Sequence, residues 1–344
     1  MTNQIPDIKG EKVLVCPLNW GLGHASRCIP IIKRLAGEGK KVYVGAEGAA
    51  LVLLIKELNG TDIERFIELK GISAKYSKGK SQTWAIIKRL PKWIGEIIEE
   101  HKEVKRIVGE RGIDTVISDN RFGAWCKKAK SVYITHQVAI KAPRGFKWSE
   151  PIIRWMHGRI IKRYDECWIP DREQDGISGE LSHQPNLPAN CKFIGTLSRL
   201  ADINPSDINP SDINPDEQAD TVAIISGPEP QRSIFEKEVA EAQKANGEKT
   251  LIIRGTPQKD ATEKDGNLTL VPHMDPATLK AQLLGAKKVI CRSGYSTMMD
   301  LDAIGVSAEI CPTPGQSEQE YLAEYLTEKK THRRWEKPKT DSRN

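Results

Sequence analysis

Histidine, arginine and two glycines gather in one short stretch near the amino terminus, PLNWGLGHASR at residues 17–27. The stretch follows the apolar run KVLVCP and precedes a helical pattern, so it turns a strand into a helix. Gly21 and Gly23 allow the backbone to approach a ligand closely. His24 then falls in the first helical turn, where free N–H groups and the helix dipole disfavour an imidazolium. A neutral imidazole there can accept a proton near pH 7, so His24 is a candidate general base.

Arg27 lies three residues after His24 and therefore on the same side of the helix, where its guanidinium can meet a phosphate or a carboxylate. Asn19 belongs to the same loop and is a further candidate for a phosphate or acceptor contact. The spacing matches neither GxGxxG nor the phosphate-binding GxxxxGK[ST]. The alternative is a purely structural turn, in which His24 is only a polar residue at a helix start.

Asp119 and Asn120 end another apolar run, DTVISD, at the same predicted sheet edge as His24. These side chains could orient His24 or bind an acceptor. The alternative is structural, with Asp119 as the cap of a helix start.

Three loops in the second half of the chain have the same placement between a strand and a helix: IISGPEPQRS (224–233), VICRSGYSTMMDLDAIG (289–305) and CPTPGQSEQEYLAEYL (311–326). In the first two, free N–H groups at the helix start can bind a diphosphate. Asp300, two turns into the second helix, is placed to accept hydrogen bonds from a ribose. The DLD at 300–302 points its carboxylates to different helix faces, so we expect no metal site there.

The third loop is unusually polar for a turn that follows an apolar strand. Gln316, Gln319 and Glu320 supply amide and carboxylate groups that suit sugar hydroxyls. Ser317 with Glu320 also has the spacing of a capping box, a structural explanation that covers half of the pattern.

Short apolar runs alternate with amphipathic stretches along the chain. The predicted strands are 12–17, 41–46, 114–119, 131–136 and 165–170 in the first half, and 221–226, 249–255, 267–274, 287–294 and 308–313 in the second. Nearly continuous apolar strands that alternate with helices predict parallel sheets covered on both faces. We therefore expect an α/β fold with two Rossmann-like domains.

The length of 344 residues also favours two domains. The predicted division is an N-terminal domain at 1–200, a linker at 201–220, a C-terminal domain at 221–330 and a basic tail at 331–344. The linker nearly repeats the unit DINPS, in which proline disfavours helix at the preceding residue. A five-residue unit with one isoleucine cannot bury a core.

Composition narrows the function classes. A charged fraction of 28%, an apolar fraction of 38% and a net charge of +6 describe a soluble globular protein. No apolar run approaches the roughly 18 residues of a membrane span, and the first residues lack the order of a signal peptide. Seven cysteines, scattered singly without metal-ligand spacing, fit thiols in a reducing, cytoplasmic compartment. No nucleic-acid motif is present, so we expect no nucleic-acid partner, and we expect no cofactor.

Two stretches mix tryptophan, isoleucine and cations: TWAIIKRLPKWIGEII (83–98) and FKWSEPIIRWMHGRIIKRY (146–164). Such basic amphipathic stretches can lie on an anionic membrane surface, such as the inner face of the plasma membrane, and would suit a lipid-linked acceptor. The alternative is ordinary domain helices whose apolar faces lie in the core and whose cations snorkel outward.

Together these loops resemble those of the GT-B glycosyltransferases, and most closely the branch with the UDP-N-acetylglucosamine transferase of lipid II synthesis and the monogalactosyldiacylglycerol synthases. The resemblance covers most of the chain in order and is carried by GLGHASR, ISGPEPQ, RSGYSTMMD and PTPGQSEQEYL. It implies two Rossmann-like domains that face each other across a cleft. The N-terminal domain would take the acceptor, and the C-terminal domain would take a nucleotide-sugar donor, expected to be UDP-linked.

The resemblance also implies roles for individual residues. His24 matches the histidine of the family's glycine-rich loop, a candidate general base or acceptor-side group. From the residues themselves, we expect Asp119 as its catalytic partner and Asn19, Gly21, Gly23, Arg27 and Asn120 around the acceptor and phosphates. The implied donor-binding residues are Ser226, Gly227, His273, Arg292, Ser293, Gly294, Asp300, Gln316, Gln319 and Glu320. Asp300 stands where the family has a glutamate on the ribose, and GPEP replaces the glycines of the donor loop. These departures leave the nucleotide and the sugar open.

The implied reaction is an inverting, metal-independent transfer of a hexosyl or N-acetylhexosaminyl group to a hydroxyl of a glycan or lipid-linked acceptor, with domain closure expelling water. A second resemblance competes, because GLGHASR is also similar to the GxGHxxR loop of nucleotide-sugar hydrolases of the pseudaminic acid pathway. In those enzymes the histidine helps to activate water. A non-catalytic sugar-nucleotide-binding protein with the same fold is a third reading.

Overall fold

The computed structural model describes residues 5–72, 82–143, 145–203 and 218–336. The chain forms two compact units: unit 1 is Met1–Arg199 with Gly315–Glu318, and unit 2 is Leu200–Pro314 with Gln319–Asn344. Most of the predicted linker (204–217) and the end of the predicted tail (337–344) lie outside the described residues.

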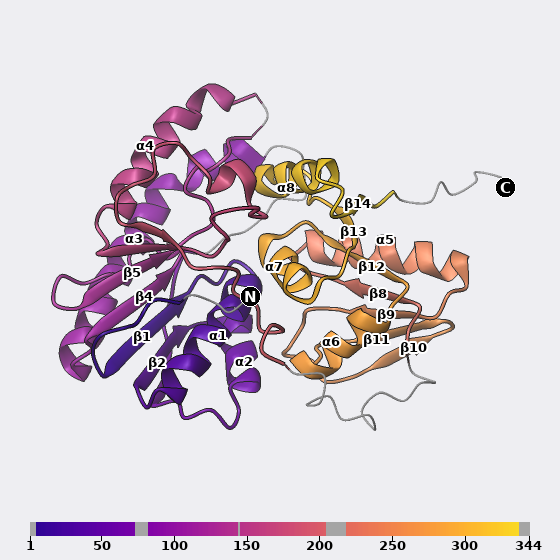
Figure 1. The fold of residues 1–344 in the computed structure, drawn as a ribbon, viewed down its shortest axis with the longest axis horizontal. Coiled ribbons are helices and arrows are strands. Elements are labelled where there is room, and N and C mark those ends of the chain that lie inside the picture. The colour runs from indigo at the N-terminus through magenta and orange to yellow at the C-terminus, as the bar shows by residue number, and fades with distance from the viewer. Residues whose placement is uncertain (1–4, 73–81, 144, 204–217, 337–344) are drawn as a thin grey trace. The chain divides into compact units, whose positions relative to one another are not determined.

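Unit 1 is built on a seven-stranded parallel sheet with the order β3-β2-β1-β4-β5-β6-β7 (Figure 1). Its strands are β1 (Lys12–Pro17), β2 (Lys41–Ala46), β3 (Arg65–Glu68), β4 (Thr115–Asp119), β5 (Lys130–Ile134), β6 (Glu166–Ile169) and β7 (Cys191–Phe193). Its α-helices are α1 (Gly23–Gly37), α2 (Gly48–Glu57), α3 (Gln82–Arg111) and α4 (Glu150–Ile161), with 3-10 turns at Lys147–Ser149 and Gly179–Leu181.

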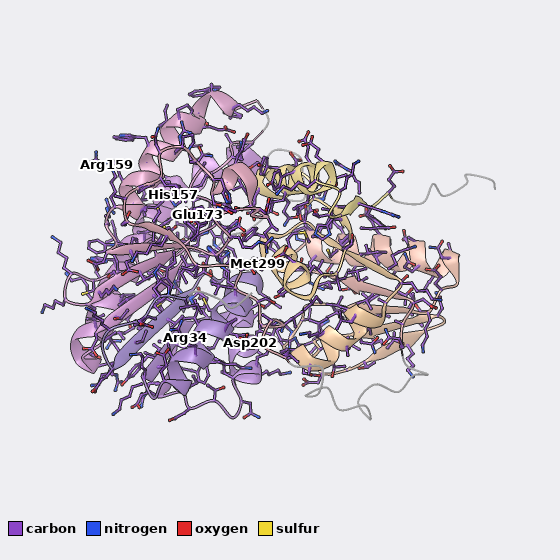
Figure 2. The ribbon with its side chains drawn as sticks, in the orientation of Figure 1. Arg34, His157, Arg159, Glu173, Asp202 and Met299 are labelled. Atoms are coloured by element: carbon purple, nitrogen blue, oxygen red, sulfur yellow. The ribbon has the colours of Figure 1, made fainter. Side chains whose placement is uncertain are left out.

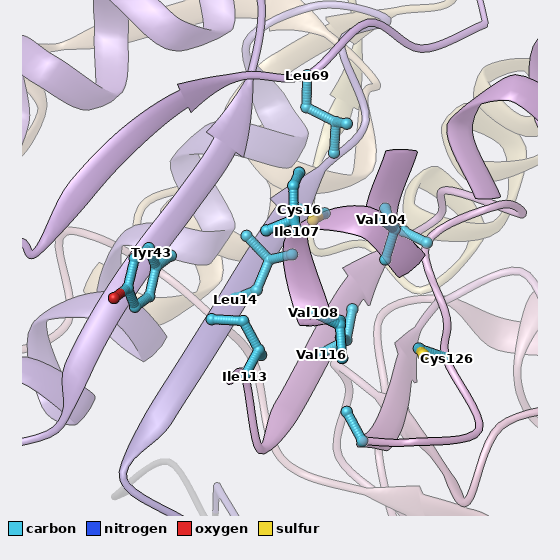
Figure 3. Packing of buried hydrophobic residues seen from close by; sticks show 12 residues of the cluster. Leu14, Cys16, Tyr43, Leu69, Val104, Ile107, Val108, Ile113, Val116 and Cys126 are labelled. Carbon is cyan, nitrogen blue, oxygen red and sulfur yellow. The ribbon is translucent and has the colours of Figure 1, made fainter. Parts of the chain in front are cut away.

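The core of unit 1 explains why its strands are apolar along their whole length. Leu14 and Cys16 of β1 pack with side chains of α3 such as Val104 (Figure 3). Val13 and Val15, which point to the opposite side of the strand, are also fully buried. Both faces of the sheet are therefore covered, as the continuous apolar runs predicted.

Unit 2 contains a second seven-stranded sheet, with the order β10-β11-β9-β8-β12-β13-β14. Its strands are β8 (Thr221–Ile224), β9 (Thr250–Ile253), β10 (Glu263–Asp265), β11 (Leu268–Val271), β12 (Lys288–Arg292), β13 (Glu309–Cys311) and β14 (Arg333–Arg334). Its helices are α5 (Gln231–Asn246), α6 (Pro276–Gly285), α7 (Tyr295–Ile304) and α8 (Ser317–Glu328), of which α8 begins within the segment grouped with unit 1. All strand pairs are parallel except β10 with β11.

The prediction of a tail from residue 331 is wrong for its first residues. Arg333–Arg334 form β14 and pair with β13 at the edge of the sheet. Trp335 then packs edge-on against Phe235 of α5, with ring centroids 5.8 Å apart. The sequence pattern did not indicate this strand, because its residues are charged and its packing depends on the single Trp335 ring.

All ten predicted strands are present, and the α/β fold with two Rossmann-like sheets is confirmed. The seven cysteines are all free thiols. Burial raises the pKa of Cys16 to about 12, so this thiol stays protonated. No helix among the described residues is long and apolar enough to cross a membrane.

Candidate functional site

The sheet topology singles out one place in each unit. In unit 1 the first strand, β1, lies between β2 and β4, and in unit 2 the first strand, β8, lies between β9 and β12. The chain therefore winds away from β1 and from β8 in two opposite directions. Ligands of open α/β sheets bind beyond the carboxyl ends of the strands at such a switch point. The loops that follow β1 and β4, and those that follow β8 and β12, carry most of the predicted site residues.

Hydrogen bonds to neighbouring segments hold the loop after β1 in place. The Leu18 amide donates to the Asp119 carbonyl at 3.0 Å, and Trp20 Nε1 donates to the Ile72 carbonyl at 2.7 Å. The Asn19 side-chain amide donates to the Glu47 carboxylate. Gly21 has φ +113°, which an L side chain rarely adopts, so glycine is required at this turn. Asn19 is thus held within the protein instead of being presented to a phosphate.

His24 lies in the first turn of α1, as predicted, and its side chain remains 18% exposed. The residue before the helix, Leu22, forms no side-chain cap, so the first N–H groups of α1 face outward without one. The Nδ1 atom of His24 lies 3.2 Å from Oδ1 of Asp119. No helix follows Asp119, which is the last residue of β4, so the alternative reading of Asp119 as a helix cap is wrong.

Arg27 does not face a phosphate, contrary to the expectation from its spacing. Its side chain is 1% exposed, and its Nε donates to Asp119 Oδ2 at 2.7 Å while Nη2 donates to Oδ1. Burial lowers the pKa of Arg27, but the Asp119 carboxylate outweighs burial and raises it overall. Burial likewise raises the pKa of Asp119, and the charges of Arg27 and His24 reverse the shift and hold it well below its usual value. Asp119 is therefore an ionised, fully buried carboxylate that contacts both side chains.

His136 and Glu318 extend this network and were missed in the sequence. Within unit 1, Arg27 Nη1 lies 3.1 Å from His136 Nδ1, and His136 Nε2 lies 2.9 Å from Glu318 Oε1. Gln137 Nε2 donates to the other oxygen of Glu318 at 2.5 Å. Burial lowers the pKa of His136, and Glu318 compensates only in part. The sequence did contain a signal for His136, because this histidine ends the predicted strand SVYITH (131–136) at the same sheet edge as Asp119.

Asn120 sits at the open side of the same edge in a left-handed conformation, with φ 58°. Such a conformation is strained for a residue with a side chain and persists where the surroundings fix it. Here a chain of buried groups does so: Tyr133 Oη lies 2.7 Å from Asn120 Oδ1 and 3.2 Å from His157 Nε2, and His157 Nδ1 lies 3.3 Å from the Val138 carbonyl. Figure 2 shows His157 on α4.

The donors and acceptors in this series of hydrogen bonds follow from the protonation state of His157. Burial lowers the pKa of His157 to about 4, so its ring carries one proton at neutral pH. The Val138 carbonyl can only accept, which places that proton on Nδ1 and leaves Nε2 as an acceptor for the Tyr133 hydroxyl. The Tyr133 hydroxyl therefore faces two acceptors, His157 Nε2 at 3.2 Å and Asn120 Oδ1 at 2.7 Å, and its single proton is shared between them.

Tyr133→Phe is expected to lower the free energy of unfolding by about 1–3 kcal/mol, because it leaves His157 Nε2 buried without a donor. The matched control is Tyr43→Phe, whose side chain is also buried but whose hydroxyl forms no hydrogen bond with a described residue. Urea unfolding of both variants checks this expectation. Equal midpoints for the two variants would contradict the proposed chain of donors.

In unit 2, three of the predicted donor residues lie together at the second switch point. Gly294 precedes α7 without any side-chain cap, so the first N–H groups of α7 are uncapped. Ser293 Oγ donates to the Gln319 carbonyl at 2.8 Å, and the Thr313 amide donates to Gln319 Oε1 at 2.8 Å. These bonds fix the Gln319 side chain next to Gly294, whose added Cβ would lie 3.7 Å from Gln319 Nε2.

Ser226 and Gly227 follow β8, the strand next to β12, so they lie at the same edge as Gly294. Gly227 has φ +102°, and nothing lies within 4 Å of the position a Cβ would take. The neighbouring start of α5 is different, because the Glu229 carboxylate accepts from the Ser233 hydroxyl at 2.9 Å there. A carboxylate at that helix start repels a diphosphate, which favours α7 over α5 as the anion site.

Arg292 is a structural residue, contrary to its predicted donor contact. Its guanidinium stacks on the Phe235 ring at 4.1 Å and Nη1 donates to the Pro312 carbonyl at 2.6 Å. Only 4% of the residue is exposed, and burial lowers the pKa of Arg292. The Arg292 side chain therefore packs between the sheet and α5.

The remaining predicted residues are more dispersed. His273 follows β11, which is separated from β8 by β9, whereas Asp300 lies half-buried in α7. Gln316 groups with unit 1, and Glu320 groups with unit 2. Ser317 is the first residue of α8, and its hydroxyl donates to the Lys141 carbonyl at 2.7 Å, so no capping box forms. Among the described residues, no cluster of three or more histidine, cysteine, aspartate or glutamate side chains could hold a metal ion.

No protein-family model and no curated protein matches this chain. Solved structures do resemble it. A glycotransferase of kitacinnamycin superposes with a TM-score of 0.59 at 13% identity, covering 94% of this chain and 86% of the other. LpCGTa in complex with UDP gives 0.57 at 12% identity, covering 96% and 86%. The glycosyltransferase SnogD from Streptomyces nogalater gives 0.56 at 14% identity, covering 95% and 87%. At these identities the likeness establishes the fold, which is that of the GT-B glycosyltransferases.

Proposed function

We propose that this protein transfers a sugar from a nucleoside diphosphate sugar to a hydroxyl acceptor, with His24 as the general base. The observation that carries the proposal is the placement of His24 at the switch point of unit 1, partly exposed and 3.2 Å from the buried, ionised Asp119. A base held by a carboxylate at a ligand-binding edge is the arrangement that activates a hydroxyl nucleophile.

The role of Asp119 is to select one form of the imidazole. Two groups approach His24 Nδ1: the acceptor Asp119 Oδ1 at 3.2 Å and the donor Arg27 Nη2 at 2.9 Å. A proton on Nδ1 is shared with Asp119 and leaves Nε2 free to take the proton of an acceptor hydroxyl. In the opposite tautomer, Nδ1 accepts a hydrogen bond from Arg27 and Nε2 carries the proton. Neither ring nitrogen can then take the proton of an acceptor hydroxyl. The proposal therefore requires the tautomer with the proton on Nδ1.

The reaction is a single displacement. As Nε2 of His24 takes the proton, the acceptor oxygen bonds to the anomeric carbon and the bond from that carbon to the diphosphate oxygen breaks. The electron pair leaves with the diphosphate, and the configuration inverts. Asn120, held at the same sheet edge by the Tyr133 hydroxyl, is a further candidate for contact with the acceptor or the sugar.

We place the donor on unit 2, with its diphosphate at the uncapped start of α7 and beside the open backbone at Gly227. Main-chain N–H groups and the helix dipole would stabilise the departing charge, so the proposed transfer needs no metal ion. Gln319, fixed beside Gly294, would form hydrogen bonds with the donor sugar. Asp300 would accept hydrogen bonds from the ribose. UDP is the proposed nucleotide, in keeping with the UDP complex of LpCGTa.

The experiment measures UDP release from a panel of UDP-sugars, with and without an acceptor pool from a cell extract. Transfer predicts release that depends on the acceptor pool. Release of free sugar without acceptor would instead identify a hydrolase, whose water would be activated by the same histidine. UDP alone should raise the melting temperature, because a ligand of the native state stabilises it. Binding without any turnover would identify a non-catalytic sugar-nucleotide-binding protein.

A further inference from the structure

The outer side of α4 carries apolar side chains that the fold leaves in solvent. Trp148 is 71% exposed, Ile152 54%, Trp155 62% and Met156 52%. Trp148 lies in the 3-10 turn just before α4, Ile152 and Met156 follow it at successive steps of four residues, and Trp155 lies three residues after Ile152. At these spacings the four side chains occupy neighbouring positions on one face. The opposite face is inside the protein, where Ile161 is fully buried. The helix therefore packs one apolar face against unit 1 and presents a second one outward.

Cations surround this outer face. Lys147, Arg154, Arg159, Lys162 and Arg163 are all exposed, and the only carboxylate of the segment, Glu150, accepts from the Ala142 amide instead of facing outward. The guanidinium of Arg159 lies 5.2 Å from the centre of the Trp155 ring. Figure 2 shows Arg159 on the same helix as the buried His157.

This combination favours one kind of occupant. Contiguous exposed apolar side chains mark an interaction surface in a soluble protein. Tryptophan rings flanked by cations suit the headgroup layer of an anionic bilayer, where the rings enter the acyl boundary and the cations meet phosphates. A second copy of this chain docked face to face would bring ten cations together against two carboxylates. Charge complementarity therefore selects an anionic lipid surface over self-association.

We propose that the α4 face, defined by Trp148, Ile152, Trp155, Met156 and the cations around them, docks the protein onto membranes rich in anionic phospholipid. The proposal does not depend on the reaction that the protein catalyses. It resolves the two readings of the stretch 146–164: its inner side is core and its outer side is an interfacial surface. In the other stretch, Ile94 and Ile98 of α3 are also exposed, at 54% and 49%.

The test measures binding of the full-length chain to vesicles by flotation. Vesicles of phosphatidylcholine with three-tenths phosphatidylglycerol should bind at least tenfold more protein than pure phosphatidylcholine, and binding should fall as salt rises. The double variant Trp148→Ser/Trp155→Ser should bind the anionic vesicles at least tenfold less. Lys162→Gln/Arg163→Gln should weaken binding roughly fivefold for each cation removed.

The matched control is Ile234→Ser/Leu284→Ser, which removes two exposed apolar side chains of α5 and α6 and should bind as the wild type does. All the altered side chains are exposed, so circular dichroism and the urea midpoint should be unchanged. A wild-type chain that fails to bind the anionic vesicles, or a tryptophan variant that binds like the wild type, overturns the proposal. A dimer that Trp155→Ser dissociates, without vesicle binding, would assign the face to self-association instead.

Discussion

Arg27→Met is expected to lower the free energy of unfolding by about 3–5 kcal/mol at pH 7, because it leaves a buried carboxylate without its counter-ion. Arg27 and Asp119 are 1% and 0% exposed, and two nitrogens of the guanidinium donate to the carboxylate. Urea unfolding measures the loss. The matched control is Arg106→Met on α3, whose ion pairs with Glu103 and Glu110 are solvent-exposed, and which should leave the midpoint unchanged.

The loss of stability in Arg27→Met should also depend on pH in a defined direction. In the wild type the pKa of Asp119 is lowered on folding, so its stabilisation is complete above the unfolded value of about 4 and is lost as the pH falls through the folded value. In Arg27→Met, burial raises the pKa of Asp119 and only the contact with His24 opposes it, so acidification relieves the variant. The difference in stability between the two proteins should therefore be smaller at pH 4.5 than at pH 7. A difference that grows on acidification would contradict the assignment of an ionised Asp119.

His24→Ala is expected to lower turnover by about 10²–10⁴-fold, because it removes the base that accepts the proton of the acceptor. His24 is 18% exposed, and Asp119 keeps both hydrogen bonds from Arg27 when the imidazole is removed, so the urea midpoint should change little. The affinity for UDP, measured by calorimetry, should stay that of the wild type, since the proposed nucleotide site belongs to unit 2.

The matched control for this variant is His101→Ala. His101 stacks on Trp125 and lies 3.2 Å from the Gly123 carbonyl, away from the Asp119 network. Its turnover should equal that of the wild type. Unchanged turnover in His24→Ala would remove His24 from the mechanism, whereas a joint loss of UDP affinity and turnover would indicate a binding role.

Local sequence patterns predicted the strands well because these strands are buried on both faces and are therefore apolar throughout. The same patterns missed the four edge strands, β3, β7, β10 and β14. RFIE of β3 is half-exposed, so its residues lack both an apolar run and a clear alternation. The β14 strand has two exposed arginines and depends on the distant contact of Trp335 with Phe235.

The sequence predicted where the candidate site lies, but not which of its side chains contact one another. His24 and Asp119 could be placed at one edge because parallel strands end together there. That Arg27 turns inward to Asp119 depends on β1 lying beside β4, a pairing between segments about a hundred residues apart. His136 depends in the same way on β5 lying beside β4. Asn120 could not be interpreted without Tyr133 and His157, because its amide orientation is set by groups on a neighbouring strand and on α4.

The most direct test of the account is the tautomer of His24 in the wild-type protein, read from the nitrogen-15 chemical shifts of its ring. The proposed mechanism requires a ring whose proton lies on Nδ1, shared with Asp119, and an unprotonated Nε2. A ring protonated on Nε2, with Nδ1 accepting from Arg27, would leave no base at the switch point and would contradict the proposed mechanism.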